Sequence, residues 1–388
     1  MNKKPSIHPD DIMYDTKQYT NTHSLDYFYQ EFSNDPTIEC IYAGAIAGPN
    51  NISLRTIPDD ILRNYILKII NPEMKILFDD IFEGIFFVEL VHKIHNSIAG
   101  TDINPAQIYY ISCTINGKEI YNKYCNAYKI TRPINIYCCN PWERHVYSGT
   151  IKDRNNIIKN KEKLLVCFNR MFKIHRYGLI ALLLEKNLVE KSYYSFFFND
   201  YADAVIRFED AYSHSRAAFS KDTADRMYNS MKANIEKFPL KLNIENRYNK
   251  NYVDEKDIEL FDNSYFSLVT ETGFIPYNEV TLIKDNTIFF SEKIYKPILV
   301  RHPFILVSAA HSLKYLRKLG YRTFSPFINE QYDDIEDHEA RLLAIVDEVE
   351  RLSKFTNTQW IDWQHSIKEI VDHNHMIIRT RKINEYAI

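Results

Sequence analysis

The stretch from Ser264 to Ser308 constrains the fold of this 388-residue chain more than any other. It begins with SYFSLVTE, in which aromatic and β-branched residues alternate in the manner of a strand. A polar loop follows, and then SEKIYKPILV, which opens with Ser291 as an N-cap and Glu292 in a first helical turn. PFILVS is a short apolar run of the kind found in buried strands. The order strand, loop, helix, strand predicts a βαβ unit.

This unit places polar side chains where a ligand can bind. Glu271 ends the first strand, while Ser291, Glu292 and Lys293 open the helix and Lys296 lies one turn later. Ligands of open α/β sheets bind outside the carboxyl ends of strands, and a helix N-terminus attracts phosphate. Carboxylates such as Glu271 or Glu292 accept hydrogen bonds from sugar hydroxyls. The pattern predicts a site for a diphosphate joined to a sugar; alternatively, Glu292 and Lys293 are ordinary charges at a helix start.

The same stretch resembles the donor-binding motif of fucosyltransferase-like and exostosin-like glycosyltransferases of GT-B architecture. In that family, an aromatic strand ending in Glu leads to Thr/Ser-Glu-Lys, an apolar residue, an aromatic residue and Lys or Arg. The corresponding positions here are Tyr265, Phe266, Glu271, Ser291, Glu292, Lys293, Ile294, Tyr295 and Lys296. Two features depart from the family pattern: Thr272 stands where Asn is usual, and the loop from Gly273 to Phe290 is longer.

The resemblance implies an enzyme, a nucleotide-sugar-dependent glycosyltransferase of the hexosyltransferase class. Its fold would be α/β, with two Rossmann-like domains facing across a cleft. It would move a sugar from a nucleotide-diphosphate donor, GDP- or UDP-linked and first of all GDP-fucose, to a hydroxyl of a glycan or another acceptor. The family commonly stabilises the leaving diphosphate with Arg and Lys, so no metal and no cofactor beyond the donor are expected.

Length and composition fit this interpretation. A chain of 388 residues exceeds the roughly 250–300 residues at which single cores stop growing. The net charge of -3 gives no basic footprint for nucleic acid, although a local basic groove stays open. The 6 cysteines lack metal-ligand spacing and are expected to be reduced thiols. No signal peptide and no membrane-spanning apolar run is found, which favours a bacterial or viral enzyme of the cytoplasm.

Alternating strand and helix patterns predict two α/β domains with mostly parallel sheets. Residues 1–150 form the predicted N-terminal domain on the acceptor side, and 160–350 the C-terminal domain on the donor side. The polar stretch 148–161 is the best linker between them. Residues 355–388 form a C-terminal helix, which in the GT-B architecture often crosses back to the first domain.

A second junction of strand and helix lies in FNRMFKIHR. Asn169 and Arg170 end a strand, and His175 and Arg176 begin a helix. An Arg fork binds phosphate oxygens, and fixed cations stabilise charge that builds up on a leaving diphosphate. The alternative for Arg176 is a solvated residue at a helix start. The predicted donor-binding residues are Asn169, Arg170, Arg176, Glu271, Thr272, Ser291, Glu292, Lys293 and Lys296.

A catalytic base is expected in the first domain, because an inverting transferase must take a proton from the acceptor hydroxyl. In LFDDIFEG, three acidic residues end a strand, and Glu83 is the first candidate and Asp80 the second. With Lys293 they form the predicted catalytic set. The alternative is that the acidic residues only form a turn.

Three further groups carry weaker signals. His92 and His95 lie three apart but lack a third metal ligand, which favours surface or core roles. The cluster Trp142–His145 either shapes the acceptor site or caps the first domain. The acidic run QYDDIEDHEA is expected to be a solvated helix start. P-loop, GxGxxG and nucleophile-elbow motifs are absent from the sequence, which argues against the usual NTPases, dehydrogenases and hydrolases.

Two other functions stay open. One is a glycosyltransferase acting on a modified nucleic-acid base, as some viruses require; the net charge of -3 counts mildly against it. The other is a carbohydrate-binding protein on the same fold that catalyses nothing, in which the acidic residues of LFDDIFEG would be dispensable.

Overall fold

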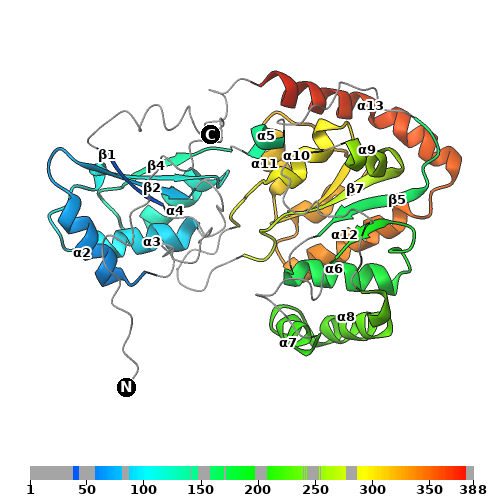
Figure 1. The fold of residues 1–388 in the computed structure, drawn as a ribbon, viewed down its shortest axis with the longest axis horizontal. Coiled ribbons are helices and arrows are strands. Elements are labelled where there is room, and N and C mark those ends of the chain that lie inside the picture. Colours follow the sequence, from blue (N-terminus) through cyan, green and yellow to red (C-terminus); the bar gives the residue numbers. More distant parts are fainter. Residues whose placement is uncertain are drawn as a thin grey trace. The chain divides into compact units, whose positions relative to one another are not determined.

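A computed structural model of the chain describes residues 38–42, 57–80, 87–140, 142–146, 158–169, 172–196, 208–238, 240, 242, 253, 255–276 and 286–381. The chain divides into two compact units (Figure 1). Unit 1 comprises Met1–Pro141, Pro276–Phe290 and Lys382–Ile388, and unit 2 comprises Trp142–Ile275 and Ser291–Arg381. The chain therefore passes between the units four times, after residues 141, 275, 290 and 381.

Unit 1 contains a four-stranded parallel sheet in the order β1-β2-β3-β4. Its core joins apolar side chains of β2 and β3 to those of three helices that pack in sequence order, α2 on α3 and α3 on α4. Pro58 is the N-cap residue of helix α2, and Asp59 and Asp60 lie in the first turn, where they suit the helix dipole. The elements are β1 Ile38–Tyr42, α2 Asp59–Ile69, β2 Lys75–Asp80, α3 Phe87–Ile98, η4 Pro105–Gln107, β3 Ile108–Ser112, α4 Gly117–Tyr128 and β4 Asn135–Cys138.

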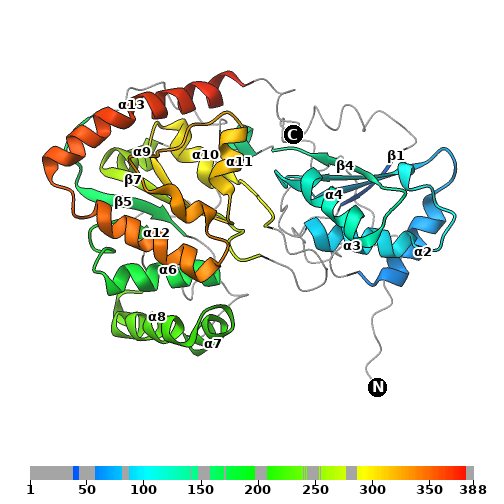
Figure 2. The same ribbon diagram turned by 180° about the vertical axis from the view of Figure 1, so that it is seen from behind.

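Unit 2 contains a second four-stranded parallel sheet, in the order β6-β5-β7-β8. All residues of β7 are buried, because helices cover both faces. Figures 1 and 2 show α6 and α12 on one side of the sheet and α9, α10 and α13 on the other. The strands are β5 Lys163–Phe168, β6 Tyr193–Ser195, β7 Ser264–Thr270 and β8 Phe304–Val307. The helices are α5 Trp142–His145, α6 Ile174–Glu185, α7 Phe208–Ala218, α8 Lys221–Ala233, η6 Ile235–Lys237, α9 Glu255–Asp262, α10 Glu292–Leu299, α11 Ser312–Lys318, η7 Glu330–Asp334, α12 His338–Leu352 and α13 Asn357–Thr380.

Helix α6 is buried between the sheet of unit 2 and a further helix. Every residue from His175 to Leu184 is buried, so the helix is covered all round rather than on one face. The sheet lies on one side of α6, and α8 packs against it from the other (Figure 2). Helix α6 is therefore a central layer of unit 2.

The α/β class and the parallel sheets predicted from the sequence are confirmed, and the βαβ unit predicted from Ser264–Ser308 is β7, α10 and β8. The first boundary between the units lies between Pro141 and Trp142, and residues 276–290 group with unit 1. Helix α13 groups with unit 2, where it packs on α10, while Lys382–Ile388 after it group with unit 1.

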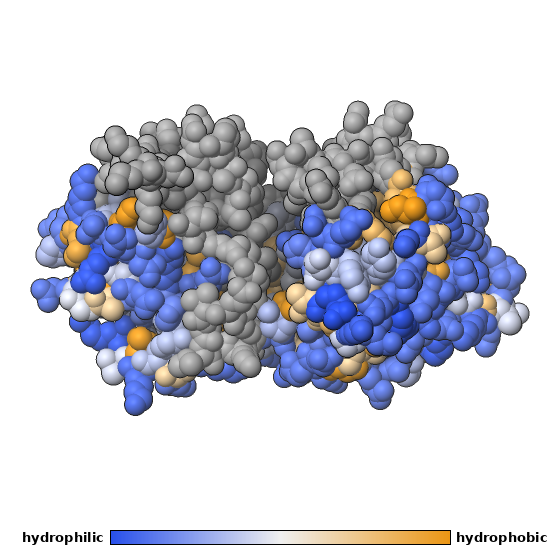
Figure 3. Space-filling model, turned by 90° about the horizontal axis from the view of Figure 1, so that it is seen from below, coloured by the Kyte–Doolittle hydropathy of each residue, from blue (hydrophilic) through white to orange (hydrophobic). Residues whose placement is uncertain are grey.

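Few large apolar side chains are exposed among the described residues. The face drawn in Figure 3 is mainly hydrophilic, with apolar side chains scattered over it. The large apolar side chains that are exposed come from different elements, namely Leu67 of α2, Ile235 of η6 and Met376 of α13. No helix among the described residues is both long enough and apolar enough to cross a bilayer.

Candidate functional site

Glu271 and Ser291 join the end of β7 to the start of α10. Glu271 is 0% exposed. Its two carboxylate oxygens accept hydrogen bonds from Ser291, one from the backbone N–H at 3.1 Å and one from the hydroxyl at 2.6 Å. Burial raises the pKa of Glu271, while Lys293 and Ser291 act to lower it. A fully buried carboxylate presents no oxygen to a sugar, so Glu271 fixes the start of α10 from behind.

The polar atoms that remain partly exposed at this helix start belong to Glu292 and Lys293. The ammonium of Lys293 donates to Ser291 Oγ at 2.9 Å and lies 3.6 Å from Glu292 Oε1. The side chains of Lys293 and Glu292 are 26% and 16% exposed. Burial raises the pKa of Glu292, but Lys293 and Lys296 together lower it below the ordinary value. An ion pair is thus held at the positive end of the helix dipole.

Asn169 follows β5 and connects the ends of three neighbouring strands. Its amide nitrogen donates to Tyr194 Oη at 3.0 Å, and its amide oxygen accepts a hydrogen bond from the Thr270 hydroxyl. Its backbone N–H donates to the carbonyl oxygen of Ser195 at 3.2 Å. Because Asn169 is buried, it orders the carboxyl edge of the sheet. Arg170, predicted beside it as the first phosphate ligand, lies outside the described residues.

Arg176 and His175, in the first turn of α6, form hydrogen bonds with the backbone at the carboxyl end of β7. Arg176 is buried and donates to the carbonyl oxygen of Thr270 at 3.1 Å, so the solvated alternative for this residue is wrong. Burial lowers the pKa of Arg176, and Glu271 opposes that shift. His175 Nε2 donates to the carbonyl oxygen of Glu271 at 3.0 Å, and its ring stacks on Phe274 at 5.1 Å. Arg176 therefore contributes a fixed positive charge beneath the strand ends.

Arg341 of α12 was not singled out from the sequence, although it organises the residues after β7 and β8. Its guanidinium donates to four backbone carbonyl oxygens, those of Phe274 at 2.6 Å, Ser308 at 3.2 Å, Ile335 at 2.6 Å and Glu336 at 3.0 Å. Burial lowers the pKa of Arg341 to about 10. The available signal was an Arg on the apolar face of a helix, since Leu342, Ile345 and Val349 are buried on that face.

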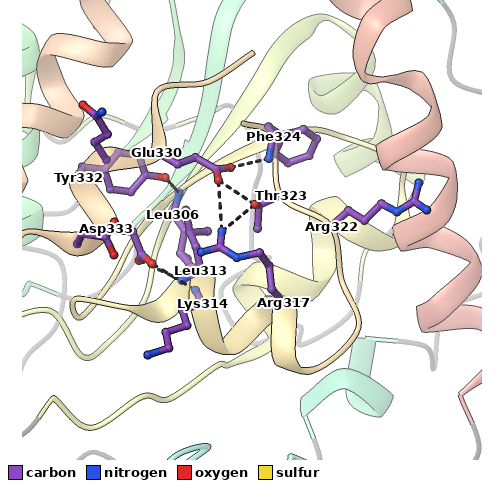
Figure 4. A network of polar contacts seen from close by, with 12 residues as sticks. Leu306, Leu313, Lys314, Arg317, Arg322, Thr323, Phe324, Glu330, Tyr332 and Asp333 are labelled. Carbon is purple, nitrogen blue, oxygen red and sulfur yellow. Dashed lines mark hydrogen bonds and ion pairs between the residues drawn. The ribbon is translucent and has the colours of Figure 1, made fainter. Parts of the chain in front are cut away.

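The start of α11, after β8, is already filled by a carboxylate of the protein. Asp333 accepts hydrogen bonds from the backbone N–H groups of Leu313 at 3.0 Å and Lys314 at 3.3 Å (Figure 4). Glu330 beside it accepts from the Thr323 hydroxyl at 2.8 Å. Of the acidic run QYDDIEDHEA, Asp333 is therefore buried, but Asp334, Glu336 and Asp337 are exposed, and Asp337 is the N-cap residue of α12, as predicted for a solvated helix start.

The two remaining residues predicted to bind the donor, Thr272 and Lys296, lie at the edge of the junction between β7 and α10. Thr272 is half-buried directly after Glu271, and Lys296 is half-buried one turn into α10. The structure thus brings together Glu271, Thr272, Ser291, Glu292, Lys293 and Lys296 through β7 and α10, and it places Asn169 and Arg176 at the neighbouring β5–α6 junction.

Of the two residues predicted to be the catalytic base, the structure describes only Asp80. This residue ends β2, is buried, and accepts a hydrogen bond from Tyr110 Oη at 2.6 Å. Burial and the neighbouring Asp80 raise the pKa of Tyr110 well above its ordinary value. Glu83, the first candidate, lies outside the described residues.

The histidines of α3 belong to the core of unit 1. His95 Nε2 lies 3.0 Å from Tyr121 Oη, and His92 Nδ1 lies 3.0 Å from Tyr124 Oη. In the described part of the chain, no group of three or more His, Cys, Asp or Glu side chains could hold a metal ion. Their contacts with Tyr121 and Tyr124 of α4 give the two histidines a packing role.

Of the cluster Trp142–His145, now helix α5, Glu143 has a clear role. It is buried, and it accepts a hydrogen bond from Arg381 at 2.8 Å, after the end of α13. Burial raises the pKa of Glu143 to about 7 even though Arg381 acts to lower it. The helix groups with unit 2.

Comparisons with known proteins find no matching family model and no matching curated protein. Among solved structures, the N-terminal domain of Candida albicans trehalose-6-phosphate phosphatase is similar over 99% of this chain and 75% of that chain, with 11% identity and a TM-score of 0.38. An α,α-trehalose-phosphate synthase (UDP-forming) from Burkholderia vietnamiensis is similar over 97% of this chain and 80% of that chain, with 13% identity and a TM-score of 0.42. Identities and TM-scores of this size do not establish a family. The likeness to fucosyltransferase-like and exostosin-like enzymes accordingly remains one of motif.

Proposed function

We propose that this chain is a glycosyltransferase and that the diphosphate of its nucleotide-sugar donor binds at the start of α10. The observation that carries the proposal is the ammonium of Lys293, partly exposed at a helix N-terminus beyond the carboxyl end of β7. Helix dipole, lysine charge and strand-end position all favour a phosphate there. The motif resemblance covers the same residues.

The residues of the junction divide into those that touch the donor and those that position it. Lys293, with Lys296, would contact the diphosphate, and Glu292 would accept hydrogen bonds from hydroxyls of the sugar or ribose. Ser291 and Glu271 would hold Lys293 and the helix start in place. Thr272 would lie at the rim of the donor site.

In the proposed reaction, the oxygen of an acceptor hydroxyl bonds to the anomeric carbon of the sugar. The bond from that carbon to the diphosphate oxygen breaks, and the diphosphate leaves with the electron pair. A carboxylate of unit 1, Glu83 or Asp80, takes the hydroxyl proton. Lys293 stabilises the negative charge that develops on the diphosphate, and the buried charge of Arg176 adds to the positive potential there. GDP-fucose is the first donor proposed, with UDP-linked sugars next, a glycan hydroxyl is the acceptor, and no metal takes part.

Replacing Lys293 tests the proposal. Lys293→Ala should lower sugar transfer by about 10²–10³-fold, the usual effect of losing one transition-state donor, while the protein still folds. The control is Lys314→Ala, which removes an exposed lysine at the start of the neighbouring helix α11. Wild-type turnover in a folded Lys293→Ala variant would remove this role.

Ligand-induced thermal stabilisation identifies the donor. GDP, UDP, CDP, ADP and their sugars are screened with and without Mg²⁺, since a ligand of the native state raises the melting temperature as ln(1 + [L]/Kd). One nucleotide should raise it in the wild type and in Lys314→Ala but not in Lys293→Ala. An absence of any shift would contradict the proposal.

A carbohydrate-binding protein without catalysis is the second candidate. The observation that favours it is Asp80, whose carboxylate is buried against Tyr110 instead of facing an acceptor. Such a protein would bind a glycan, show no turnover with any nucleotide sugar, and keep its affinity in an Asp80→Asn, Glu83→Gln double variant.

A further inference from the structure

The last part of the connection from β7 to α10 packs in unit 1, although both of these elements belong to unit 2. We propose that Asn116, which holds this segment, is a positioning residue for the donor site. The inference rests on the proposed function for what the site binds. The segment, Asn286–Phe290, is called the docked segment below.

The docked segment is attached to the residues that follow β3. Its Phe289 forms an antiparallel bridge with Thr114, and the backbone N–H of Ile115 donates to the carbonyl oxygen of Ile288 at 2.8 Å. Ile288, Phe289 and Phe290 are all buried. These contacts continue the carboxyl end of a central strand of unit 1 and fix the segment's backbone there.

Asn116 completes the attachment with both ends of its side-chain amide. Its nitrogen donates to the carbonyl oxygen of Asn286 at 2.7 Å, and its oxygen accepts from the backbone N–H of Ile288 at 2.9 Å. Together they act as a pair of strand hydrogen bonds supplied by one side chain. Asn116 is itself buried, so neither bond competes with bulk water.

Asn116 bonds the docked segment although its position in the chain favours a different hydrogen bond. It is the N-cap residue of α4, where an Asn side chain normally accepts a hydrogen bond from the N–H of the second or third helical residue. Here the side chain makes no capping bond. By contrast, Asn104, the N-cap residue of η4 in the same unit, accepts from the backbone N–H of Ala106 at 3.2 Å. Asn116 is thus committed to the docked segment instead of its own helix.

The docked segment leads directly into the candidate donor site. Only Phe289 and Phe290 separate Ile288 from Ser291, which caps α10, bonds Glu271 and contacts the Lys293 ammonium. The backbone that enters Ser291 is therefore fixed on one side by Asn116 and on the other by Glu271. Loosening the first attachment frees the chain just before Ser291, so the start of α10 is less often in the geometry that binds a diphosphate.

The test uses Asn116→Ser, because serine is equally favoured at an N-cap position but is too short to bond both groups of the docked segment. In this variant, native-state hydrogen exchange should become faster at Ile288 and Ser291 while α4 keeps its protection. The KM for the donor should rise about tenfold, equivalent to about 1.4 kcal/mol of binding free energy, with the acceptor KM unchanged. Asn104→Ser, the same change at a capping position of unit 1, should alter neither quantity.

Three results would contradict either the positioning role of Asn116 or the proposed function. Unchanged exchange at Ser291, or an unchanged donor KM with faster exchange, would overturn the positioning role. A kinetic change shared equally by Asn104→Ser would assign the effect to general destabilisation and would also overturn it. If the wild type neither binds nor transfers any nucleotide sugar, the proposed function fails; faster exchange at Ser291 in Asn116→Ser would then still support Asn116 as the residue that orders the start of α10.

Discussion

The hydroxyl group of Ser291 takes part in three hydrogen bonds at once. It donates to Glu271 Oε2 at 2.6 Å and accepts from the backbone N–H of Lys293 at 3.3 Å and from the Lys293 ammonium at 2.9 Å. One small side chain therefore connects a buried carboxylate with the partly exposed cation that the donor would contact. The bond to a charged acceptor makes this hydroxyl costly to remove.

Ser291→Ala should weaken both the site and the fold. Glu271 Oε2 would lose its hydroxyl donor, which costs about 1–3 kcal/mol of unfolding free energy for a buried acceptor. Affinity for the donor nucleotide should fall about tenfold, because Lys293 loses the oxygen that orients it. Ser291→Thr keeps the hydroxyl and should retain most of both quantities. Calorimetric titration and urea unfolding of the two variants measure the difference, and wild-type affinity in Ser291→Ala would contradict it.

The sequence predicted where the polar residues of the site lie but not which of them are buried. Positions at strand ends and helix starts follow from local periodicity, so Glu271, Ser291 and Lys293 could be grouped from their order alone. Burial of Glu271 and Arg176 depends on distant partners. Arg341, for example, fixes Phe274 across 67 residues of sequence. Nothing local distinguishes a buried charge from a solvated one when its neighbours come from another part of the chain.

At the scale of elements, α4 lies close to β4 and α3 because it begins with a glycine. A Cβ atom on Gly117 would lie 2.6 Å from Cys138 Sγ and 3.0 Å from Phe87 Cε2. Cys138 is short and buried, so it has little freedom to move away. The close approach of these three elements therefore requires the absence of a side chain at this position.

Gly117→Ala should destabilise unit 1 even though alanine favours a helix more than glycine. Overpacking of a filled core costs about 1–3 kcal/mol, which exceeds or offsets the gain of about 1 kcal/mol in helix propensity. Denaturant unfolding measures the net loss. Adding Cys138→Ala should restore part of it, since the two changes are coupled through one contact. Strictly additive effects of the two substitutions would count against this packing argument.

Local sequence patterns predicted several helices and strands correctly, but not the pairing of the docked segment. Helices α6 and α10 and strands β2, β5, β7 and β8 lie where local patterns placed them. The docked segment was expected to be part of a polar loop, but its partner Asn116 lies 170 residues away. A pairing of this kind is decided by tertiary contacts and leaves no periodic signal in the segment itself.

At the scale of the whole molecule, both units contain buried histidines whose pKa burial lowers, His95 in unit 1 and His175 and His302 in unit 2. His302 in unit 2 donates from Nε2 to the carbonyl oxygen of Ser264 at 2.9 Å and accepts at Nδ1 from the Ser267 hydroxyl at 2.8 Å. Burial lowers its pKa to about 3. His95 in unit 1 lies 3.0 Å from the Tyr121 hydroxyl, and burial lowers its pKa to about 4.

Both units should therefore lose stability in mild acid. Each histidine has a folded pKa below its unfolded value of about 6.5, so the unfolded chain takes up the proton first as pH falls. The stabilisation is complete above pH 6.5 and is lost as pH falls toward about 4 for His95 and about 3 for His302. Relative to pH well above 6.5, His302 alone should lower the unfolding free energy at pH 5 by about 2 kcal/mol, at 1.36 kcal/mol per pH unit.

Hydrogen exchange followed separately in each unit at pH 6.5 and 5 tests this distribution, after correction for the intrinsic exchange rate. His302→Gln cannot titrate, so it should reduce the pH dependence of protection in β7 and β8, where buried His175 still takes up a proton, and leave that of α3 and β3 as in the wild type. His95→Gln should do the reverse, which makes each variant the control for the other. If either variant flattened both units equally, the two cores would unfold as one; if neither did, the buried histidines would not be the groups that take up the proton.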